Sequence, residues 1–87
     1  MPKFIAVHTL PFNEKEFLAQ AKELAKLELP KGLNWSLTYC AFGEHKFFCE
    51  WEAPTKEALK KHFKQIEIPY DAIHSVKLFD VAKGKMK

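Results

Sequence analysis

Residues 33–52 read LNWSLTYCAFGEHKFFCEWE, and the pattern of this stretch decides the fold. Its two outer parts, 33–42 and 47–52, are rich in the aromatic and other apolar side chains that favour strands. Between them lies Gly43-Glu44-His45-Lys46, a polar sequence that begins with the glycine favoured in tight turns. The stretch therefore predicts a β-hairpin in the middle of the chain.

The segments on either side of the hairpin predict one helix and one strand each. Residues 3–9 predict a short strand, and Asn13 predicts the cap of a helix that ends near Glu28. After the hairpin, Thr55 predicts the cap of a second helix, and 73–81 predict the last strand. The order β-α-β-β-α-β predicts an α+β fold of the ferredoxin-like type. In this fold both helices cover one face of a four-stranded antiparallel sheet and leave the other face open.

The length of the chain limits it to one domain. With 87 residues there is room for one hydrophobic core, so we expect a single domain over residues 1–87. Lysines crowd the end of the chain, and we expect 82–87 to be a flexible basic tail. A core this small gives marginal stability, which favours association with a partner.

The charged residues argue against several kinds of partner. The net charge is +3, and all 14 basic residues are lysine. Arginine supplies the planar fork that reads phosphates and guanine edges, so its absence argues against specific nucleic-acid recognition. No stretch approaches the ~20 apolar residues that cross a bilayer, and the first apolar run is too short for a secretory signal. We therefore expect a cytoplasmic protein with no nucleic-acid or membrane partner, in which Cys40 and Cys49 are free thiols.

The two strands of the hairpin divide their side chains between the helices and the open face. If Phe42 pairs with Phe47, then Cys40 opposes Cys49, and these side chains and Trp51 face the helices. Directly opposed cysteines are within reach of a disulfide, although buried cysteines more often act as small apolar groups. The open face then carries polar and acidic side chains: Tyr39, Glu50 and Glu52.

The first predicted strand is apolar at almost every position, so alternation alone does not tell which face each side chain takes. We assign the faces by which side chains suit contact with the helices. We expect Ile5 and Val7 to face the helices, which leaves Phe4, Ala6 and His8 on the open face. An open face of this composition needs a cover. We therefore predict a homodimer or higher homo-oligomer that forms through the open sheet face, and a dimeric α/β barrel as the assembled form.

The histidines suggest a metal site. Imidazole nitrogens and carboxylates bind divalent transition metals such as nickel or zinc. The predicted topology brings all four histidines toward one end of the sheet, and we take His8, His74 and Glu50 as candidate metal ligands. The alternative is that His8 and His74 are hydrogen-bonded to backbone at strand ends, that His62 lies in the core, and that His45 is a solvated turn residue.

Two carboxylates on the third predicted strand suggest further chemistry. Glu50 and Glu52 alternate with Trp51, so they share a face and are able to act in acid–base chemistry or bind a cation. The alternative is that they face water or pair with lysine. Four residues are candidates for lining a ligand pocket: Tyr39, Glu52, His45 and His62.

The second half of the chain resembles the small nickel-binding-protein family. The similar motifs are FCEWEAP at 48–54, Ala58-Leu59, His62, and IPYDAIHSV at 68–76. The resemblance implies a ferredoxin-like fold, self-association through the sheet and binding of nickel. Transferred by position, the implied metal ligands are His8, Cys49 and His74.

A second resemblance is to the dimeric α/β-barrel monooxygenases that use no cofactor. It rests on Glu50, Trp51, Glu52, Ala58 and His62. It implies a cavity between sheet and helices that holds an aromatic substrate. Three functions therefore stay open: a metal- or small-ligand-binding domain, an oxygenase- or isomerase-like enzyme, and an interaction module with no site.

Overall fold

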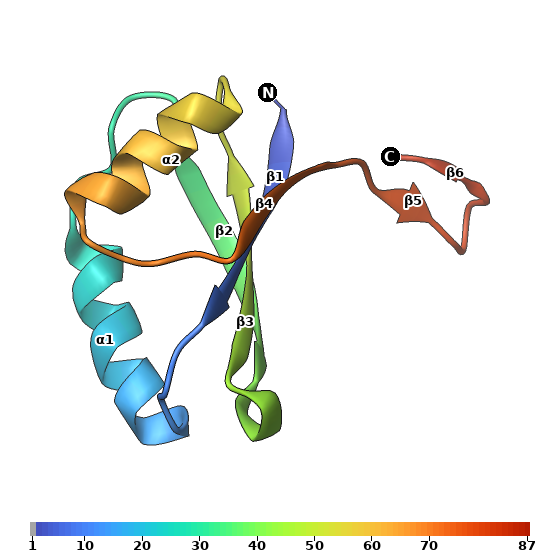
Figure 1. Ribbon diagram of the computed structural model, residues 1–87. Helices are drawn as coiled ribbons and strands as arrows, with labels where there is room; N and C mark the ends of the chain where they lie inside the picture. The colour runs from blue at the N-terminus through green and yellow to red at the C-terminus, as the bar shows by residue number, and fades with distance from the viewer. Residues whose placement is uncertain (1) are drawn as a thin grey trace.

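The predicted order of strands and helices is confirmed by the computed structural model, which describes residues 2–87. The elements are β1 (Lys3–Thr9), α1 (Glu14–Lys26), β2 (Asn34–Ala41), β3 (Lys46–Glu52), α2 (Lys56–Gln65) and β4 (Ala72–Val76). The four strands form an antiparallel sheet in the order β2-β3-β1-β4. Both helices cover one face of this sheet, as Figure 1 shows. The fold is therefore α+β and ferredoxin-like.

Side-chain caps fix where both helices begin. The Asn13 side chain accepts a 2.8 Å hydrogen bond from the Glu16 backbone, and Glu16 accepts one of 3.0 Å from the Asn13 backbone. At α2 the Thr55 hydroxyl accepts a 3.1 Å hydrogen bond from the Ala58 amide. Each cap satisfies amides that the first helical turn leaves without partners. No helix within residues 2–87 is long and apolar enough to cross a membrane.

The hairpin between β2 and β3 is shifted by two residues from the predicted pairing. Residues Phe42–Glu44 form a 3₁₀ turn, so Phe42 leaves the ladder, and His45 closes the turn with a φ of 57°. Cys40 therefore pairs with Phe47, and Cys49 pairs with Thr38. The predicted opposition of Cys40 and Cys49 is wrong, and both are free thiols. Because the shift is even, the faces predicted for β3 are correct.

The faces predicted for β1 are wrong. Phe4, Ala6 and His8 are buried toward the helices, whereas Ile5 and Val7 lie on the open face. The register explains this arrangement, because it sets Phe4, Ala6 and His8 opposite the three buried residues of β3: Trp51, Cys49 and Phe47. Apolar residues at both parities of β1 gave the sequence no means of distinguishing the faces.

The end of the chain also differs from the prediction. Strand β4 stops at Val76, five residues before the predicted end, and a two-stranded ribbon of β5 (Phe79–Asp80) and β6 (Lys85–Met86) follows. We call residues 77–87 the C-terminal arm. In Figure 1 the arm projects from the sheet on the side opposite the helices. The predicted tail, 82–87, includes the second strand of this ribbon.

The core lies between α2 and the sheet. Leu59 and Phe63 of α2 are almost fully buried against Phe4, Ala6 and Trp51. By contrast, α1 has no fully buried residue. Space therefore remains between α1 and the sheet, and this space contains the candidate site.

Leu59 offers a test of the core. Leu59→Ala removes a side chain with 0% exposure and leaves a cavity. We expect it to lower the free energy of unfolding by about 2–5 kcal/mol in urea denaturation followed by circular dichroism. Leu18→Ala is the control, because Leu18 is 48% exposed on α1. Equal losses in the two variants would contradict the described packing.

Candidate functional site

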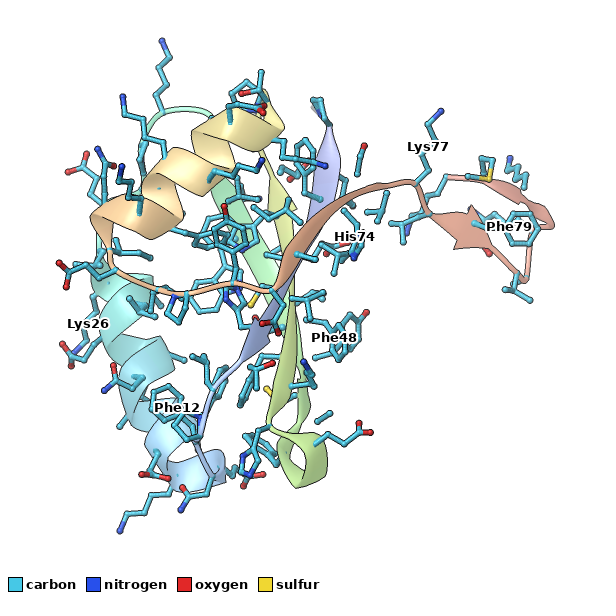
Figure 2. The ribbon with its side chains drawn as sticks, in the orientation of Figure 1. Phe12, Lys26, Phe48, His74, Lys77 and Phe79 are labelled. Carbon is cyan, nitrogen blue, oxygen red and sulfur yellow. The ribbon has the colours of Figure 1, made fainter. Side chains whose placement is uncertain are left out.

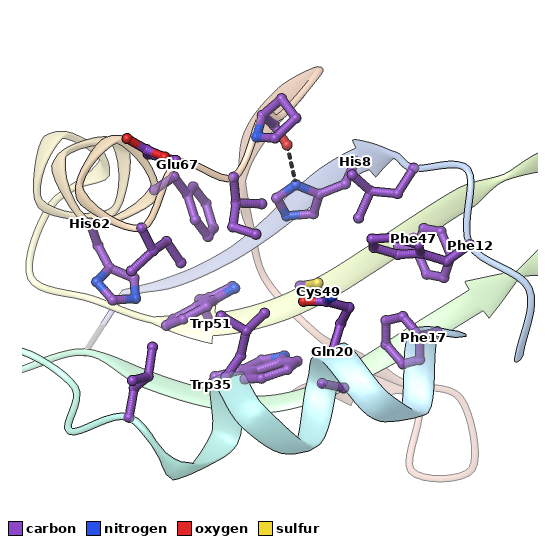
Figure 3. A pocket seen from close by; sticks show the side chains of 18 of the residues that line it. His8, Phe12, Phe17, Gln20, Trp35, Phe47, Cys49, Trp51, His62 and Glu67 are labelled. Carbon is purple, nitrogen blue, oxygen red and sulfur yellow. Dashed lines mark hydrogen bonds between the residues drawn. The ribbon is translucent and has the colours of Figure 1, made fainter. Parts of the chain in front are cut away.

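A cavity of about 220 Å³ lies between the two helices and the sheet. Its walls come from β1, β2, β3, both helices and the segment 66–69 that follows α2, as Figure 3 shows. Most of the lining is aromatic or aliphatic, and the polar groups that reach it are few. We call this cavity the helix-side pocket.

His8 enters the helix-side pocket from the end of β1. Its Nδ1 lies 2.7 Å from the carbonyl oxygen of Pro69, drawn as a dashed line in Figure 3. A carbonyl only accepts hydrogen bonds, so Nδ1 carries the proton and Nε2 keeps its lone pair. Burial lowers the pKa of His8 below 6.5, although the Pro69 carbonyl and Asp71 act in the opposite direction. The ring is therefore neutral at pH 7, with Nε2 as an acceptor.

The Pro69 carbonyl that orients His8 is held in place from outside the pocket. The Asp71 amide donates a 2.7 Å hydrogen bond to the Val7 carbonyl. The Asp71 carboxylate accepts a hydrogen bond from Thr9 and lies 3.1 Å from Lys46 Nζ. These contacts lower the pKa of Asp71 and tie the turn after α2 to the end of β1. The turn thereby presents the Pro69 carbonyl to His8.

Two stacked indoles form the floor of the pocket, and they differ in hydrogen bonding. Trp35 and Trp51 have ring centroids 5.9 Å apart and planes 11° apart. Trp35 Nε1 donates a 2.8 Å hydrogen bond to the Thr38 hydroxyl. Trp51 Nε1 is buried and has no partner among residues 2–87. In Figure 3 this nitrogen lies on the ring edge that faces Cys49. A buried N–H without a partner costs about 1–3 kcal/mol.

Cys49 is a neutral thiol in this pocket. Its Sγ accepts a 3.2 Å hydrogen bond from the Thr38 hydroxyl. Burial raises the pKa of Cys49 to about 11, while the bond from Thr38 acts in the other direction. Because metal ions bind the thiolate, a protonated Cys49 is a poor ligand near pH 7.

His62 occupies the α2 side of the pocket. It is buried, and its ring lies 5.5 Å from the Trp51 ring. Burial lowers the pKa of His62 as well. The pocket therefore contains two imidazoles, and both favour the neutral form.

The remaining predicted residues of the sheet lie on its open face. His74 and Glu50 sit on either side of Ile5 in one row across β4, β1 and β3. Strands are spaced about 4.8 Å apart, so two strand spacings of about 10 Å separate His74 from Glu50. Figure 2 shows His74 and Phe48 on the side of the sheet away from the helices. Tyr39, 63% exposed, is on this face.

The acidic residues of the open face have polar partners. Glu50 Oε1 lies 3.4 Å from Lys3 Nζ, and Glu50 Oε2 accepts a 2.9 Å hydrogen bond from Ser36. Glu52 accepts a 3.0 Å hydrogen bond from the Asn34 side chain. Both carboxylates are thus held within the chain.

The structure does not gather the predicted metal ligands. His8 and Cys49 lie on the helix side of the sheet, whereas His74 and Glu50 lie on the open face, so one ion does not reach all four. Within residues 2–87 no three His, Cys, Asp or Glu side chains form a group that could hold a metal. His45 is exposed in the hairpin turn and lies outside the helix-side pocket. The inverted faces of β1 are the reason for this correction.

Sequence reasoning missed three groups of the site. The Thr38 hydroxyl, the Pro69 carbonyl and the Trp35 indole were not singled out, and their roles depend on tertiary contacts. A bulge between Trp35 and Leu37 turns Trp35 toward the helices. Strict alternation from Thr38 places Trp35 on the open face, so the sequence carried no signal for it.

The buried histidines predict a pH dependence of stability. For a histidine with a lowered folded pKa, the unfolded chain binds the proton more readily, so stability falls as pH drops through and below 6.5. We expect urea unfolding midpoints to decrease between about pH 7.5 and pH 5. The lowered pKa of Asp71 stabilises the folded state above about pH 3.8, its ordinary pKa. This contribution is lost only at lower pH, outside the range in which the histidines titrate.

His8→Gln tests this assignment, because glutamine keeps a donor for the Pro69 carbonyl without a titrating ring. We expect this variant to show a smaller decrease in midpoint over the same pH range. The matched control is His74→Gln, which changes an exposed histidine. An unchanged pH dependence in His8→Gln would contradict the assignment.

Comparison with known proteins identifies the family. Residues 4–76 match the family model described as "Nickel responsive protein SCO4226-like". Among solved structures, the chain is similar to the crystal structure of SCO4226 from Streptomyces coelicolor A3(2), with a TM-score of 0.72 and 18% sequence identity. The match covers 87% of this chain and 96% of that one. A comparison with curated proteins finds no match. The family model spans most of the chain, which therefore belongs to the SCO4226-like family of nickel-responsive proteins.

Proposed function

We propose that this protein binds a small, neutral aromatic molecule in the helix-side pocket. The observation that carries the proposal is a cavity with a mostly apolar lining, whose wall includes the Trp51 indole. The Trp51 N–H is buried and has no acceptor among residues 2–87. A ligand that accepts this hydrogen bond removes the cost of burying an unpaired donor. The size agrees, because a cavity of about 150 Å³ holds benzene and this one measures about 220 Å³.

The polar groups of the pocket define the ligand more closely. Trp51 carries an unpaired donor, and His8 carries Nε2 as an acceptor. The other polar side chains of the lining are His62, Gln20 and Glu67. A ring with a hydroxyl group satisfies both, because a hydroxyl accepts one hydrogen bond and donates another. No lysine lines the pocket, and neutral imidazoles give an anion little compensation for its lost hydration. Neutral phenols are therefore the ligand class that the pocket fits best.

Calorimetric titration of the purified protein with phenol and its alkyl derivatives tests the proposal. Trp51→Phe removes the free N–H and keeps a ring, and we expect roughly tenfold weaker binding, equivalent to about 1.4 kcal/mol. Trp35→Phe is the matched control, because its N–H already bonds Thr38. We expect less than about a threefold change there.

Two results would count against this proposal. The first is an absence of binding by every phenol in the series, and the second is an equal loss in the Trp51 and Trp35 variants. Conversion of the ligand during incubation in air would instead favour the oxygenase-like enzyme.

The protein is proposed to act as a homodimer that forms through the open sheet face, as a dimeric α/β barrel. Ile5, Val7 and Phe48 form an apolar centre on this face, and Leu37 and Tyr39 are exposed beside it. A second copy would remove these side chains from water, which is the main driving force for association.

A divalent metal, nickel or zinc, at the dimer seam is the second candidate function. Its support is the description of the family as nickel-responsive, together with His74 and Glu50 in one row of the open face. One chain supplies too few ligands there, whereas two copies facing each other would supply two imidazoles and two carboxylates.

Nickel titration of the full chain by calorimetry separates this candidate from the pocket. We expect His74→Ala to weaken nickel binding at least tenfold and His45→Ala, an exposed histidine of the hairpin turn, to leave it unchanged. Phenol binding in the helix-side pocket is expected to be equal in both variants. If His74→Ala binds nickel as tightly as the unaltered protein, the metal proposal fails.

A further inference from the structure

We propose that the C-terminal arm, residues 77–87, clasps a second copy of this chain beside the open sheet face. The proposal rests on the homodimer proposed above and adds a contact surface to it. The family match ends at residue 76, so the arm lies outside the part of the chain that defines the family. The clasp is therefore argued from the arm itself.

The arm carries an unusual share of exposed apolar side chains. Eight large hydrophobic residues are exposed among residues 2–87, and four of these lie in the arm: Leu78 39%, Phe79 56%, Val81 83% and Met86 55%. Leu37 and Tyr39, on the open face, account for two more. The exposed apolar surface is thus concentrated on the arm and on the face that awaits a partner.

The arm is folded on itself rather than on the body. The Lys87 amide donates a 2.8 Å hydrogen bond to the Leu78 carbonyl, and the Asp80 side chain accepts one of 3.1 Å from the Lys83 amide. Gly84, with a φ of 64°, completes the turn. Within residues 2–87 no recorded hydrogen bond or ion pair joins the arm to residues 2–76. An isolated two-stranded ribbon is marginal in water, so this one needs something to pack against.

The direction of the arm identifies what it packs against. Figure 1 shows it projecting beyond the sheet on the side away from the helices. Figure 2 places Phe48, His74 and Phe79 on that same side. A second copy seated on the open face would therefore lie directly alongside the arm, and symmetry would bring its own arm against the first copy.

The area of the open face supports the same conclusion. Four strands spaced about 4.8 Å apart and five to eight residues long give the face a flat footprint of about 400 Å². A standard interface buries about 800 Å² on each partner. A fully buried phenylalanine removes about 150–250 Å² from water, and Phe79 is 56% exposed, so about half of that area is available at this residue. The arm therefore enlarges the apolar surface that the sheet face offers to a second copy.

Sedimentation velocity over a concentration series of the full chain tests the clasp. The arm variant carries Phe79→Gln together with Val81→Gln. We expect its dimer dissociation constant to be at least tenfold larger than that of the unaltered protein. Leu18→Gln, an exposed leucine on α1, is the control and should dimerise normally. Phe79 and Val81 are 56% and 83% exposed, so the arm variant should keep the circular dichroism spectrum of the unaltered protein.

An open-face variant, Phe48→Lys, separates the two proposals. If Phe48→Lys dissociates the dimer and the arm variant does not, the clasp is wrong and the sheet-face dimer stands. If the unaltered protein is monomeric at every concentration, both proposals fail. The arm also carries lysines, so a membrane surface is the alternative partner. Flotation with anionic lipid vesicles tests for it. Vesicle binding that is lost in the arm variant, with dimerisation intact, would overturn the clasp.

Discussion

The register of β1 between β3 and β4 is the constraint on which the rest of the structure depends. This strand is hydrogen-bonded along both edges, and its alternation sends Phe4, Ala6 and His8 toward the helices. Ala6 has no exposed surface, so the helices leave no room for a larger side chain there. A slip of one residue exchanges the two faces of the strand. The position of His8 in the pocket, and of Ile5 between His74 and Glu50, follows from this single register.

Hydrogen bonds link three polar groups near the pocket, those of Trp35, Thr38 and Cys49, and none of these bonds includes the Trp51 N–H. Thr38 accepts a hydrogen bond from Trp35 and donates one to Cys49, so a single hydroxyl serves two buried groups. His8 uses Nδ1 for the Pro69 carbonyl. The Trp51 N–H and His8 Nε2 remain without recorded partners, and both residues line the same cavity, as do His62, Gln20 and Glu67. An apolar cavity with two such groups is the usual composition of a small-molecule site.

The sequence was informative wherever one residue type decided the local structure. Asn13 and Thr55 located the helix starts, because their side chains cap the first turns. The alternation of β3 separated its faces, because only one parity of that strand contains glutamates. The hairpin register was wrong because a 3₁₀ turn removes Phe42 from the ladder. Alternation did not separate the faces of β1, because both parities of that strand are apolar. The predicted metal ligands are divided between the two faces for the same reason, since His8 of β1 faces the helices and His74 and Glu50 face away from them.

The division of the site residues between two faces also makes the open face suitable for a partner. Burying a carboxylate without a partner is costly, and an open face with free glutamates would resist being covered. Glu50 is already held by Lys3 and Ser36, and Glu52 by Asn34. Covering this face therefore removes apolar surface from water while its acidic groups keep their contacts. The helix-side pocket lies across the sheet from that surface, so occupation of the pocket and assembly of the dimer do not compete for the same side chains.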